Sequence, residues 1–221
     1  MSLKEKFSYC RSTFRRYGVI GFLTFYTYLI IKKVLKIEYR KSLFFRADLN
    51  NTLFNSNLIF EKLSLSDFEK LRNSYNTYDN WFSEIKIKRF REWLRSGSKE
   101  AFGNFQDKIL TCYGWINYNV KGIGNVKFQG KDVYIFDDYT SPQFRGKGYQ
   151  RDIIHYRMKI AAEKGYDKVW AEVYSFNKAS IKNYINMGFT PLVTMRLLKI
   201  GKRKPKYFFS YKNALLSQRD S

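Results

Sequence analysis

Hydrophobic and polar residues follow one another along the chain in two rhythms, a two-residue alternation and a three- to four-residue spacing. The alternation predicts strands at residues 41–49, 57–63, 108–116, 125–130, 132–138, 168–176, 189–200 and 206–212. The longer spacing predicts helices at 81–95, 149–165 and 177–188. A short helix is predicted to begin at Ser66, because Glu69 completes a capping box there. Gly122 and Gly124 fit a hairpin turn, since neither a dinucleotide fingerprint nor a Walker phosphate loop is completed around them.

The order of these elements favours a mixed α/β (α+β) fold, with a central, mostly antiparallel sheet flanked by helices. One parallel crossover is expected where the strand at 132–138 leads through a glycine-rich loop into the helix at 149–165, and a functional site is expected there. The chain is long enough for one well-filled domain, predicted at 42–221. A basic, apolar helical segment is predicted to precede it at 1–41.

The formal net charge of +22 is concentrated at the two ends of the sequence. Residues 1–41 contain ten Lys or Arg and two Glu, and residues 196–221 contain eight Lys or Arg and one Asp. These ends carry +8 and +7, which leaves +7 for the 154 residues between them. A basic surface concentrates anions, such as phosphate-bearing cofactors, nucleotide-linked substrates, acidic lipids or nucleic acids. Charge alone does not choose among these partners.

Residues 17–31 form an uncharged, aromatic-rich run between two pairs of basic residues. A helix of this length would span about 22 Å, short of the roughly 30 Å hydrocarbon core of a bilayer, so we do not expect a full span. A secretory signal also fits poorly, because no small-x-small cleavage site precedes the next basic cluster. Two interpretations stay open: a buried or homodimer-forming helix, and a helix lying on an anionic membrane surface.

Cysteine and histidine usage argues against a metal site and against a disulfide framework. Cys10 and Cys112 have no Cys or His neighbour at metal-ligand spacing, which fits a reducing cytoplasm. His155 is the only histidine, so a serine-type triad would depend on it alone. We interpret it as a structural or surface histidine and expect no metal in the site.

The glycine-rich loop has the features of an anion site. Gly146 and Gly148 remove side chains where a backbone must approach a ligand closely. The helix that begins there presents unpaired N–H groups and a partial positive charge. Together with Arg145 and Lys147, these features predict a pyrophosphate-binding turn. The R-G-x-G pattern alone is a weak signal, because glycine-rich helix starts also serve as purely structural turns.

The sequence "QFRGKG" at 143–148 matches the Gln/Arg-x-x-Gly-x-Gly/Ala signature of the GNAT superfamily of acyl-CoA N-acyltransferases. Downstream, "VYSFNKASIKNYINMGF" at 173–189 resembles the second motif of this family through Asn177, Ser180, Tyr184 and the Gly188–Phe189 end. The resemblance covers residues 57–211 and implies a GNAT-like fold. In that fold the strands at 132–138 and 168–174 splay apart, and the acyl group enters the gap.

The resemblance further implies acetyl-CoA as the co-substrate and N-acetyl transfer as the reaction. Residues around the loop would hold its pyrophosphate or its pantetheine arm: Tyr139, Thr140, Gln143, Arg145, Gly146, Lys147, Gly148 and Tyr149. Asn177 would contact the cofactor from the far side. Tyr184 would protonate the departing thiolate, with a packed helix aromatic as the alternative interpretation of this residue.

The general base is the least determined part of the site. An amine attacks a thioester directly once it is neutral, so the protein must orient the two, stabilise the oxyanion and accept a proton. Asp137, Asp138 and Glu172 could each do this, directly or through water. Alternation places Asp137 and Asp138 on opposite faces, so at most one should face the acyl group unless a bulge intervenes. Asp137 is the preferred candidate, and a cap or salt-bridge role is the alternative for each carboxylate.

The resemblance also implies that the N-terminal hundred residues set acceptor specificity, and in this chain they are rich in aromatic residues. These residues suit sugar rings or nucleobases, but most are better explained as core: Tyr75, Tyr78, Trp81, Phe82, Phe90 and Trp93. The stretch "YIFDDYTSPQFRGKGY" at 134–149, with Trp115 on an upstream strand and the basic apolar N-terminus, gives a looser resemblance to GNAT proteins of bacterial surface-polysaccharide gene sets. It implies an amino sugar, nucleotide- or lipid-linked, as acceptor. We expect a cytoplasmic protein from its cysteine usage, and a lipid-linked acceptor would also explain an N-terminal helix in peripheral contact with the inner face of the membrane.

Two other classes of function stay open. The fold could bind an acyl-CoA without turning it over, as a regulatory module. Acetylation could instead be directed at a protein or an RNA-associated substrate. We do not expect nucleic acid as the main partner, because the basic residues accompany an apolar, aromatic run rather than a nucleic-acid recognition motif.

Overall fold

A computed structural model describes residues 19–20, 23–24, 26–27, 30, 37–49, 58–74, 80–123, 126–201 and 203–211 of the chain. The chain divides into two compact units. The described residues of the first unit lie within Asp48–Lys121 and Phe128–Val169. Those of the second unit lie within Arg11–Ala47, Gly122–Lys127 and Trp170–Ser221.

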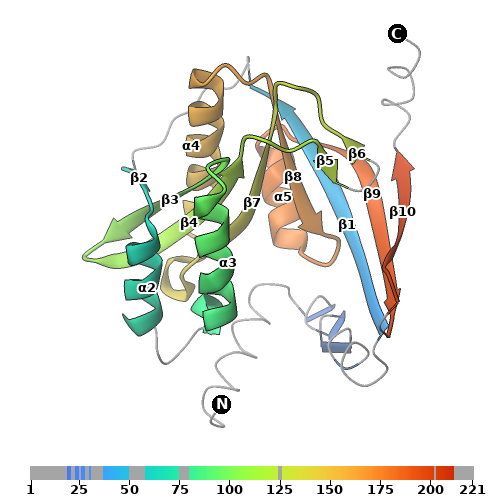
Figure 1. The fold of residues 1–221 in the computed structure, drawn as a ribbon, viewed down its shortest axis with the longest axis horizontal. Coiled ribbons are helices and arrows are strands. Elements are labelled where there is room, and N and C mark those ends of the chain that lie inside the picture. Colours follow the sequence, from blue (N-terminus) through green and yellow to red (C-terminus); the bar gives the residue numbers. More distant parts are fainter. Residues whose placement is uncertain are drawn as a thin grey trace. The chain divides into compact units, whose positions relative to one another are not determined.

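The first unit is a sheet with helices on both faces (Figure 1). Its strands are β2 (Glu61–Lys62), β3 (Lys99–Gln106), β4 (Ile109–Asn117) and β7 (Asp132–Thr140), and each pairs antiparallel with the next. One face is covered by α2 (Leu65–Ser74), the 3₁₀ helix η1 (Asn80–Phe82) and α3 (Glu84–Arg95). The other face packs against α4 (Tyr149–Glu163), and the 3₁₀ helix η2 (Pro142–Phe144) connects β7 to α4.

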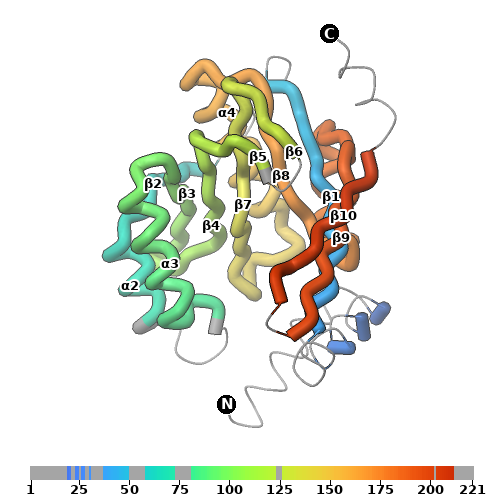
Figure 2. Tube along the Cα trace, turned by 45° about the vertical axis from the view of Figure 1, so that its right-hand side comes forward, coloured from blue at the N-terminus to red at the C-terminus, as the bar shows by residue number. Residues whose placement is uncertain are grey.

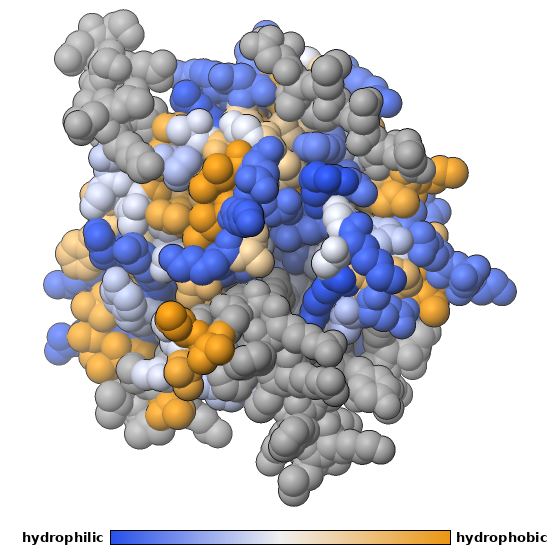
Figure 3. Space-filling model, turned by 180° about the vertical axis from the view of Figure 1, so that it is seen from behind, coloured by the Kyte–Doolittle hydropathy of each residue, from blue (hydrophilic) through white to orange (hydrophobic). Residues whose placement is uncertain are grey.

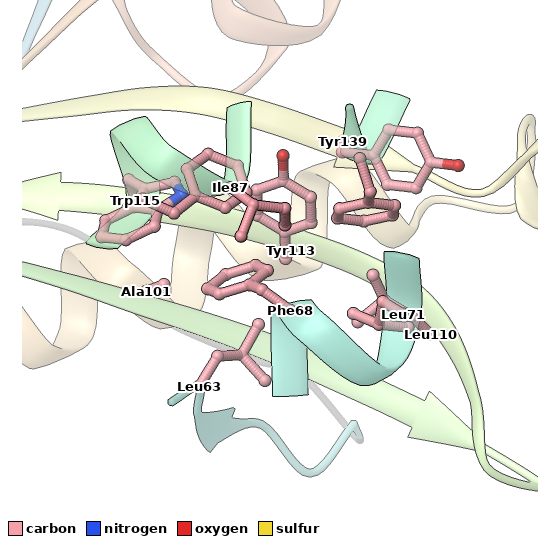
Figure 4. Packing of buried hydrophobic residues seen from close by; sticks show 11 residues of the cluster. Leu63, Phe68, Leu71, Ile87, Ala101, Leu110, Tyr113, Trp115 and Tyr139 are labelled. Carbon is pink, nitrogen blue, oxygen red and sulfur yellow. The ribbon is translucent and has the colours of Figure 1, made fainter. Parts of the chain in front are cut away.

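An aromatic cluster fills the space between this sheet and the helices α2 and α3 (Figure 4). The rings of Phe68 and Trp115 stack with centroids 5.6 Å apart, and Phe90 lies 5.1 Å from Trp115. Rings of this size bury enough apolar surface to dominate the energetics of a core. The expectation that Phe82 and Phe90 are core residues is confirmed, while Trp81 and Trp93 pack against the cluster. Tyr75 and Tyr78 lie outside the described residues.

The second unit contains a long antiparallel ladder. Its strand order is β10 (Lys206–Tyr211), β9 (Thr190–Ile200), β1 (Ile37–Asp48) and β8 (Lys168–Tyr174), of which Lys168 and Val169 belong to the first unit. Both β1 and β10 run antiparallel to β9, and the three strands lie side by side in Figure 2. The helix α5 (Lys178–Asn186) packs against β9. The predicted hairpin is present as β5 (Gly122–Ile123) and β6 (Val126–Lys127).

The predicted fold class is confirmed, because the chain is a mixed α/β protein with mostly antiparallel sheet flanked by helices. The splaying of the strands at 132–138 and 168–174 stays a prediction, since most of the second strand belongs to the other unit. The domain boundary at residue 41 also stays a prediction. Most of residues 1–36 lie outside the described residues, and the described positions between 19 and 30 are helical. Within the described ranges, no helix is long and apolar enough to cross a membrane.

Some predicted elements differ from the structure. The strand predicted at 57–63 shrinks to Glu61–Lys62, and the one at 125–130 shrinks to Val126–Lys127. The strand β3 was not predicted, because Gly103 and Asn104 interrupt its alternation. A Cβ on Gly103 would lie 3.1 Å from the backbone carbonyl oxygen of Cys112 and 2.9 Å from the end of the Leu63 side chain, so the close approach of the neighbouring strand favours glycine. The capping box of α2 lies two residues earlier than predicted: the Asp67 carboxylate accepts from the backbone N–H and hydroxyl of Ser64.

Candidate active site

The loop between β7 and α4 has the backbone geometry of an anion-binding turn. Gly146 and Gly148 adopt left-handed conformations with φ of +79° and +88°, and Gly148 is the N-cap of α4. A Cβ added at Gly146 would meet no other atom within 4 Å. Glycine is therefore required at 146 by its conformation rather than by packing against the protein. The turn delivers the chain to the amino end of a 15-residue helix, where N–H groups and the helix dipole favour an anion.

Basic side chains surround this turn. The Arg145 Nε donates to the carbonyl of Thr140 at 3.1 Å, which ties the loop back to the end of β7. Lys147 lies 5.5 Å from the centre of the Phe144 ring. Arg151 in the first turn of α4 is 3.3 Å from the position of a Cβ on Gly148, and its Nε contacts Asp152 at 3.2 Å. Three cations therefore lie within seven residues of one another at the start of the helix.

A β-bulge in β7 decides where the two candidate carboxylates point. Tyr113 on β4 pairs with Tyr139 and Trp115 pairs with Phe136, so Asp137 and Asp138 together oppose Gly114. Asp137 takes the left-handed conformation, with φ of +52°. Regular alternation of side chains therefore does not hold at Asp137 and Asp138, because the strand bulges there. Asp137 and Tyr139 both contact the side of the sheet that carries α3, while Asp138 contacts α4.

Asp138 forms a buried ion pair that has a structural role. Its Oδ1 accepts from Arg157 of α4 at 2.6 Å, and the Arg157 side chain has no exposed surface. The same guanidinium donates to the carbonyls of Trp115 at 2.7 Å and Ile153 at 3.1 Å. A Cβ on Gly114 would lie 2.5 Å from this guanidinium, so the glycine makes room for it. The salt-bridge interpretation therefore applies to Asp138.

Asp137 belongs to a polar cluster at the edge of the aromatic core. Its Oδ1 lies 3.0 Å from the ammonium of Lys86, and its Oδ2 accepts from the Tyr113 hydroxyl at 3.1 Å. That hydroxyl in turn accepts from Trp81 Nε1 at 2.7 Å. Figure 4 shows the Tyr113 hydroxyl pointing away from Phe68 and Leu63, at the edge of the cluster.

Burial raises the pKa of Tyr113 well above its ordinary value, and the Asp137 charge adds to the effect. The phenol therefore stays protonated and donates to the carboxylate. The Asp137 side chain keeps 19% of its surface exposed, so it can reach a molecule from solvent.

Tyr139 and Thr140 end β7 as predicted, directly before the loop. The Tyr139 side chain is buried and stacks on Trp81 with ring centroids 5.2 Å apart. Only its backbone is therefore suited to pair with a pantetheine arm. The buried Ser141 amide is used inside the protein, since it donates to the Thr111 carbonyl at 2.9 Å.

Of the remaining predicted site residues, Gln143 lies in η2 and Tyr149 begins α4 in the first unit, whereas the others lie in the second unit. Asn177 is the N-cap of α5, where its side chain accepts from the Ser180 N–H. Tyr184 is buried, with its ring stacked on Phe45 at 5.7 Å. Glu172 lies 3.4 Å from the Arg40 guanidinium. Because these residues and the loop belong to different units, cofactor contact by Asn177 and proton donation by Tyr184 stay predictions.

Sequence reasoning did not identify Lys86, Tyr113 or Arg157. Lys86 stands in a helix with several other cations, and Tyr113 and Arg157 contact their partners only through long-range pairing. The sequence does mark Lys86 as unusual. Ser83 is the N-cap of α3, and Lys86 stands three residues later, where a capping box would have Glu or Gln.

Other candidate chemistry takes no part in this arrangement. Burial raises the pKa of the Cys112 thiol to about 12, which makes it a poor nucleophile. Burial and the nearby Arg151 charge lower the pKa of His155. Within the described residues, no three His, Cys, Asp or Glu side chains gather as a metal-ion site.

Solved structures with the same fold include several at low sequence identity. A protein from Novosphingobium aromaticivorans described as a GNAT-family acetyltransferase is 15% identical, with a TM-score of 0.53 over 76% of this chain and 66% of that one. A GNAT-family acetyltransferase from Colwellia psychrerythraea is 15% identical, with a TM-score of 0.51 over 79% and 57%. A functionally unknown conserved protein from Staphylococcus epidermidis is 11% identical, with a TM-score of 0.51 over 78% and 66%. The chain thus spans somewhat under two thirds of each of these proteins.

No curated protein matches the sequence. The model of the acetyltransferase (GNAT) family matches residues 66–189, which is more than half of the chain and includes the bulge, the glycine turn and α5. The chain belongs to the acetyltransferase (GNAT) family.

Proposed function

We propose that the protein transfers an acetyl group from acetyl-CoA to a primary amine by direct attack of the amine on the thioester. The observation that carries this proposal is the turn at Gly146–Gly148, which opens α4 with two left-handed glycines among three cations. Membership of the acetyltransferase (GNAT) family supports the same acyl donor.

The residues of the turn fit the pyrophosphate of coenzyme A. The space beside Gly146 allows close approach of a ligand to the backbone. Amides at the start of α4 and the charges of Arg145, Lys147 and Arg151 suit two adjacent phosphates. The thioester supplies the activated acyl group, and the backbone at the end of β7 would orient it.

Asp137 is the proposed acceptor of the amine proton. It lies at the bulge, its side chain reaches solvent, and the Tyr113 hydroxyl fixes its orientation. A general base must lie within hydrogen-bond reach of the proton that it removes, which a side chain on a bulge can satisfy more easily than one inside a regular ladder. Tyr184 is the proposed acid for the departing thiolate.

An amino sugar, linked to a nucleotide or a lipid, is the proposed acceptor, and surface-polysaccharide synthesis is the proposed context. The strong positive charge of the chain suits an acceptor that carries a diphosphate. On the face shown in Figure 3, hydrophilic side chains surround apolar patches. Exposed apolar side chains in the N-terminal helical segment include Val19, Ile20, Leu23 and Ile30. They support a cytoplasmic protein in peripheral contact with an anionic membrane.

Thiol release from acetyl-CoA tests the proposal directly. The full chain is assayed with amino-sugar nucleotides, a lipid-linked amino sugar, amino acids, polyamines and a basic peptide. Release with one amino-sugar nucleotide would support both the reaction and the acceptor class. Release only with the peptide would favour a protein acceptor. Coenzyme A binding without release in any arm, including a lipid-linked amino sugar, would favour the non-catalytic acyl-CoA module.

A further inference from the structure

The ammonium group of Lys86 occupies a site made of three other side chains of the first unit. It lies 3.3 Å from the centre of the Trp81 ring and 3.0 Å from Asp137 Oδ1. Phe90 contributes a second ring at 5.5 Å. An aromatic face combined with a carboxylate is the usual protein environment for an alkylammonium ion.

The walls of this site are held in fixed positions. Trp81 stacks on Tyr139, and its indole N–H donates to the Tyr113 hydroxyl at 2.7 Å. The same hydroxyl donates to Asp137 at 3.1 Å. Trp81 therefore presents its ring face to the ammonium, while its N–H joins the chain of hydrogen bonds that orients the carboxylate. Such preorganisation reduces the cost of binding a ligand.

Several local features of this site are unfavourable for stability. Lys86 is the third residue of α3, where a cation opposes the helix dipole and where a capping box places an acid. Asp137 adopts a left-handed conformation, which is unfavourable for a residue other than glycine. Departures from local preference that converge on one point are typical of functional sites.

We propose that Trp81 and Asp137 form the binding site for the ammonium group of the acceptor, and that Lys86 fills this site as an internal competitor that the acceptor displaces. The inference rests on the proposed function in one respect, since it takes Asp137 as the residue that receives the amine proton. Lys86 and Asp137 retain 15% and 19% of their side-chain surface exposed, so a small cation can reach the pair from solvent. A primary alkylammonium, which has the shape of the end of a lysine side chain, is the class of ligand that fits.

The test uses n-butylammonium as the probe and n-butanol as its neutral counterpart, in ligand-detected NMR titrations of the full chain at constant ionic strength. Lys86→Ala removes the competitor and should bind n-butylammonium about tenfold more tightly than the unmodified protein. Adding Asp137→Asn to this variant should weaken the binding about tenfold again. Lys88→Ala is the matched control, because Lys88 is an exposed cation of the same helix, and it should bind as the unmodified protein does.

The proposal is overturned if Lys86→Ala binds n-butylammonium no more tightly than the unmodified protein. It is also overturned if n-butanol binds as tightly as n-butylammonium, or if Asp137→Asn leaves the affinity unchanged. If thermal unfolding shows that the alanine variant does not fold, Lys86→Gln replaces it, and its affinity for n-butylammonium is compared with that of the unmodified protein in the same way.

The thiol-release assay separates this proposal from the proposed function. Tighter n-butylammonium binding without acyl transfer to any amine would leave the ammonium site standing and refute the proposed reaction. Acyl transfer together with unchanged n-butylammonium binding would refute the site alone.

Discussion

At the scale of single residues, substitution of Gly146 can distinguish the effect of backbone strain on stability from the effect of the turn on coenzyme A binding. Gly146 and Gly165 have φ of +79° and +80°, and an added Cβ meets no neighbour at either position. Valine at either position should therefore lower the free energy of unfolding by a similar amount, about 1–2 kcal/mol. Only Gly146→Val should weaken coenzyme A binding, by about tenfold or more, since Gly165 lies at the other end of α4. Equal affinities of the two variants by calorimetry would contradict the phosphate-turn assignment.

Tyr184 offers a second test at this scale. Its ring stacks on Phe45 and meets Phe189 edge-on at 4.9 Å, and phenylalanine would keep both contacts. If the hydroxyl is the acid, Tyr184→Phe should lower turnover by about tenfold to a hundredfold and leave coenzyme A affinity nearly unchanged. Unaltered turnover in steady-state assays would assign this residue to packing only.

At the scale of elements, the bulge in β7 gives two adjacent aspartates different tasks. Asp138→Asn should lower the free energy of unfolding by about 3 kcal/mol, because it leaves the buried Arg157 without its countercharge. Asp137→Asn should cost only about 1 kcal/mol, since asparagine tolerates the left-handed conformation and the Lys86 pair is partly exposed. It should instead lower turnover by about a hundredfold. Urea unfolding and thiol release measured on both variants would expose the opposite pattern if the roles were exchanged.

Glu100 on β3 contacts Lys62 of β2 and two residues that directly follow β4 and α4, and it predicts a dependence of stability on pH. Burial alone would raise the pKa of Glu100, but hydrogen bonds from Lys62, Tyr118 and Lys164 outweigh it and lower the pKa from 4.5 to about 2. A lowered pKa in the folded state means that this contribution is fully present above pH 4.5 and is lost as the pH falls toward 2.

After allowance for screening by solvent, the contribution of Glu100 is about 1–2 kcal/mol. Glu100→Gln should therefore destabilise the protein more at pH 7 than at pH 3 in urea titrations. A loss of equal size at both pH values would mean that the charge of Glu100 is not what stabilises the fold.

The helices and strands also show which elements can be predicted from local sequence patterns. Helices and strands with regular spacing, such as α4 and β9, were predicted close to their observed bounds because their periodicity is local. The strand β3 was missed because Gly103 and Asn104 interrupt its alternation, and the close approach of the Cys112 backbone that favours glycine at 103 is not encoded in any local pattern.

The candidate site likewise contains some residues that the sequence predicts and others that it does not. The glycine turn carries its own motif, so its place before α4 could be predicted from the sequence, while the binding roles of its residues stay a prediction. Lys86, Tyr113 and Arg157 gain their roles only when β4, β7 and the two helices come together. The adjacent Asp137 and Asp138 raise the question of a bulge in the sequence. Whether the bulge exists depends on the register between β7 and β4, which the sequence does not give.

At the scale of the whole molecule, the basic ends of the chain predict binding to anionic membranes. The full chain should sediment with vesicles that contain anionic lipid, and the bound fraction should fall as salt rises from 0.05 to about 0.5 M, because screening weakens the attraction. Deleting residues 1–33 should release most of the protein from the vesicles. Binding to neutral vesicles of equal strength would contradict the electrostatic part of the proposal. Tighter, salt-dependent binding to RNA than to vesicles would favour the nucleic-acid alternative.

The aromatic cluster gives the protein an internal optical probe. The chain has four tryptophans, and three of them, Trp81, Trp93 and Trp115, lie in or against the cluster of the first unit, while Trp170 lies in the second. Replacing Trp170 with phenylalanine would confine the tryptophan emission to the first unit. Trp93 and Trp115 meet edge to face at 5.0 Å, a geometry that should couple their strong electronic transitions and give a split circular dichroism band in the far ultraviolet. Loss of that band on heating would then report the melting of the first unit separately from the rest of the chain.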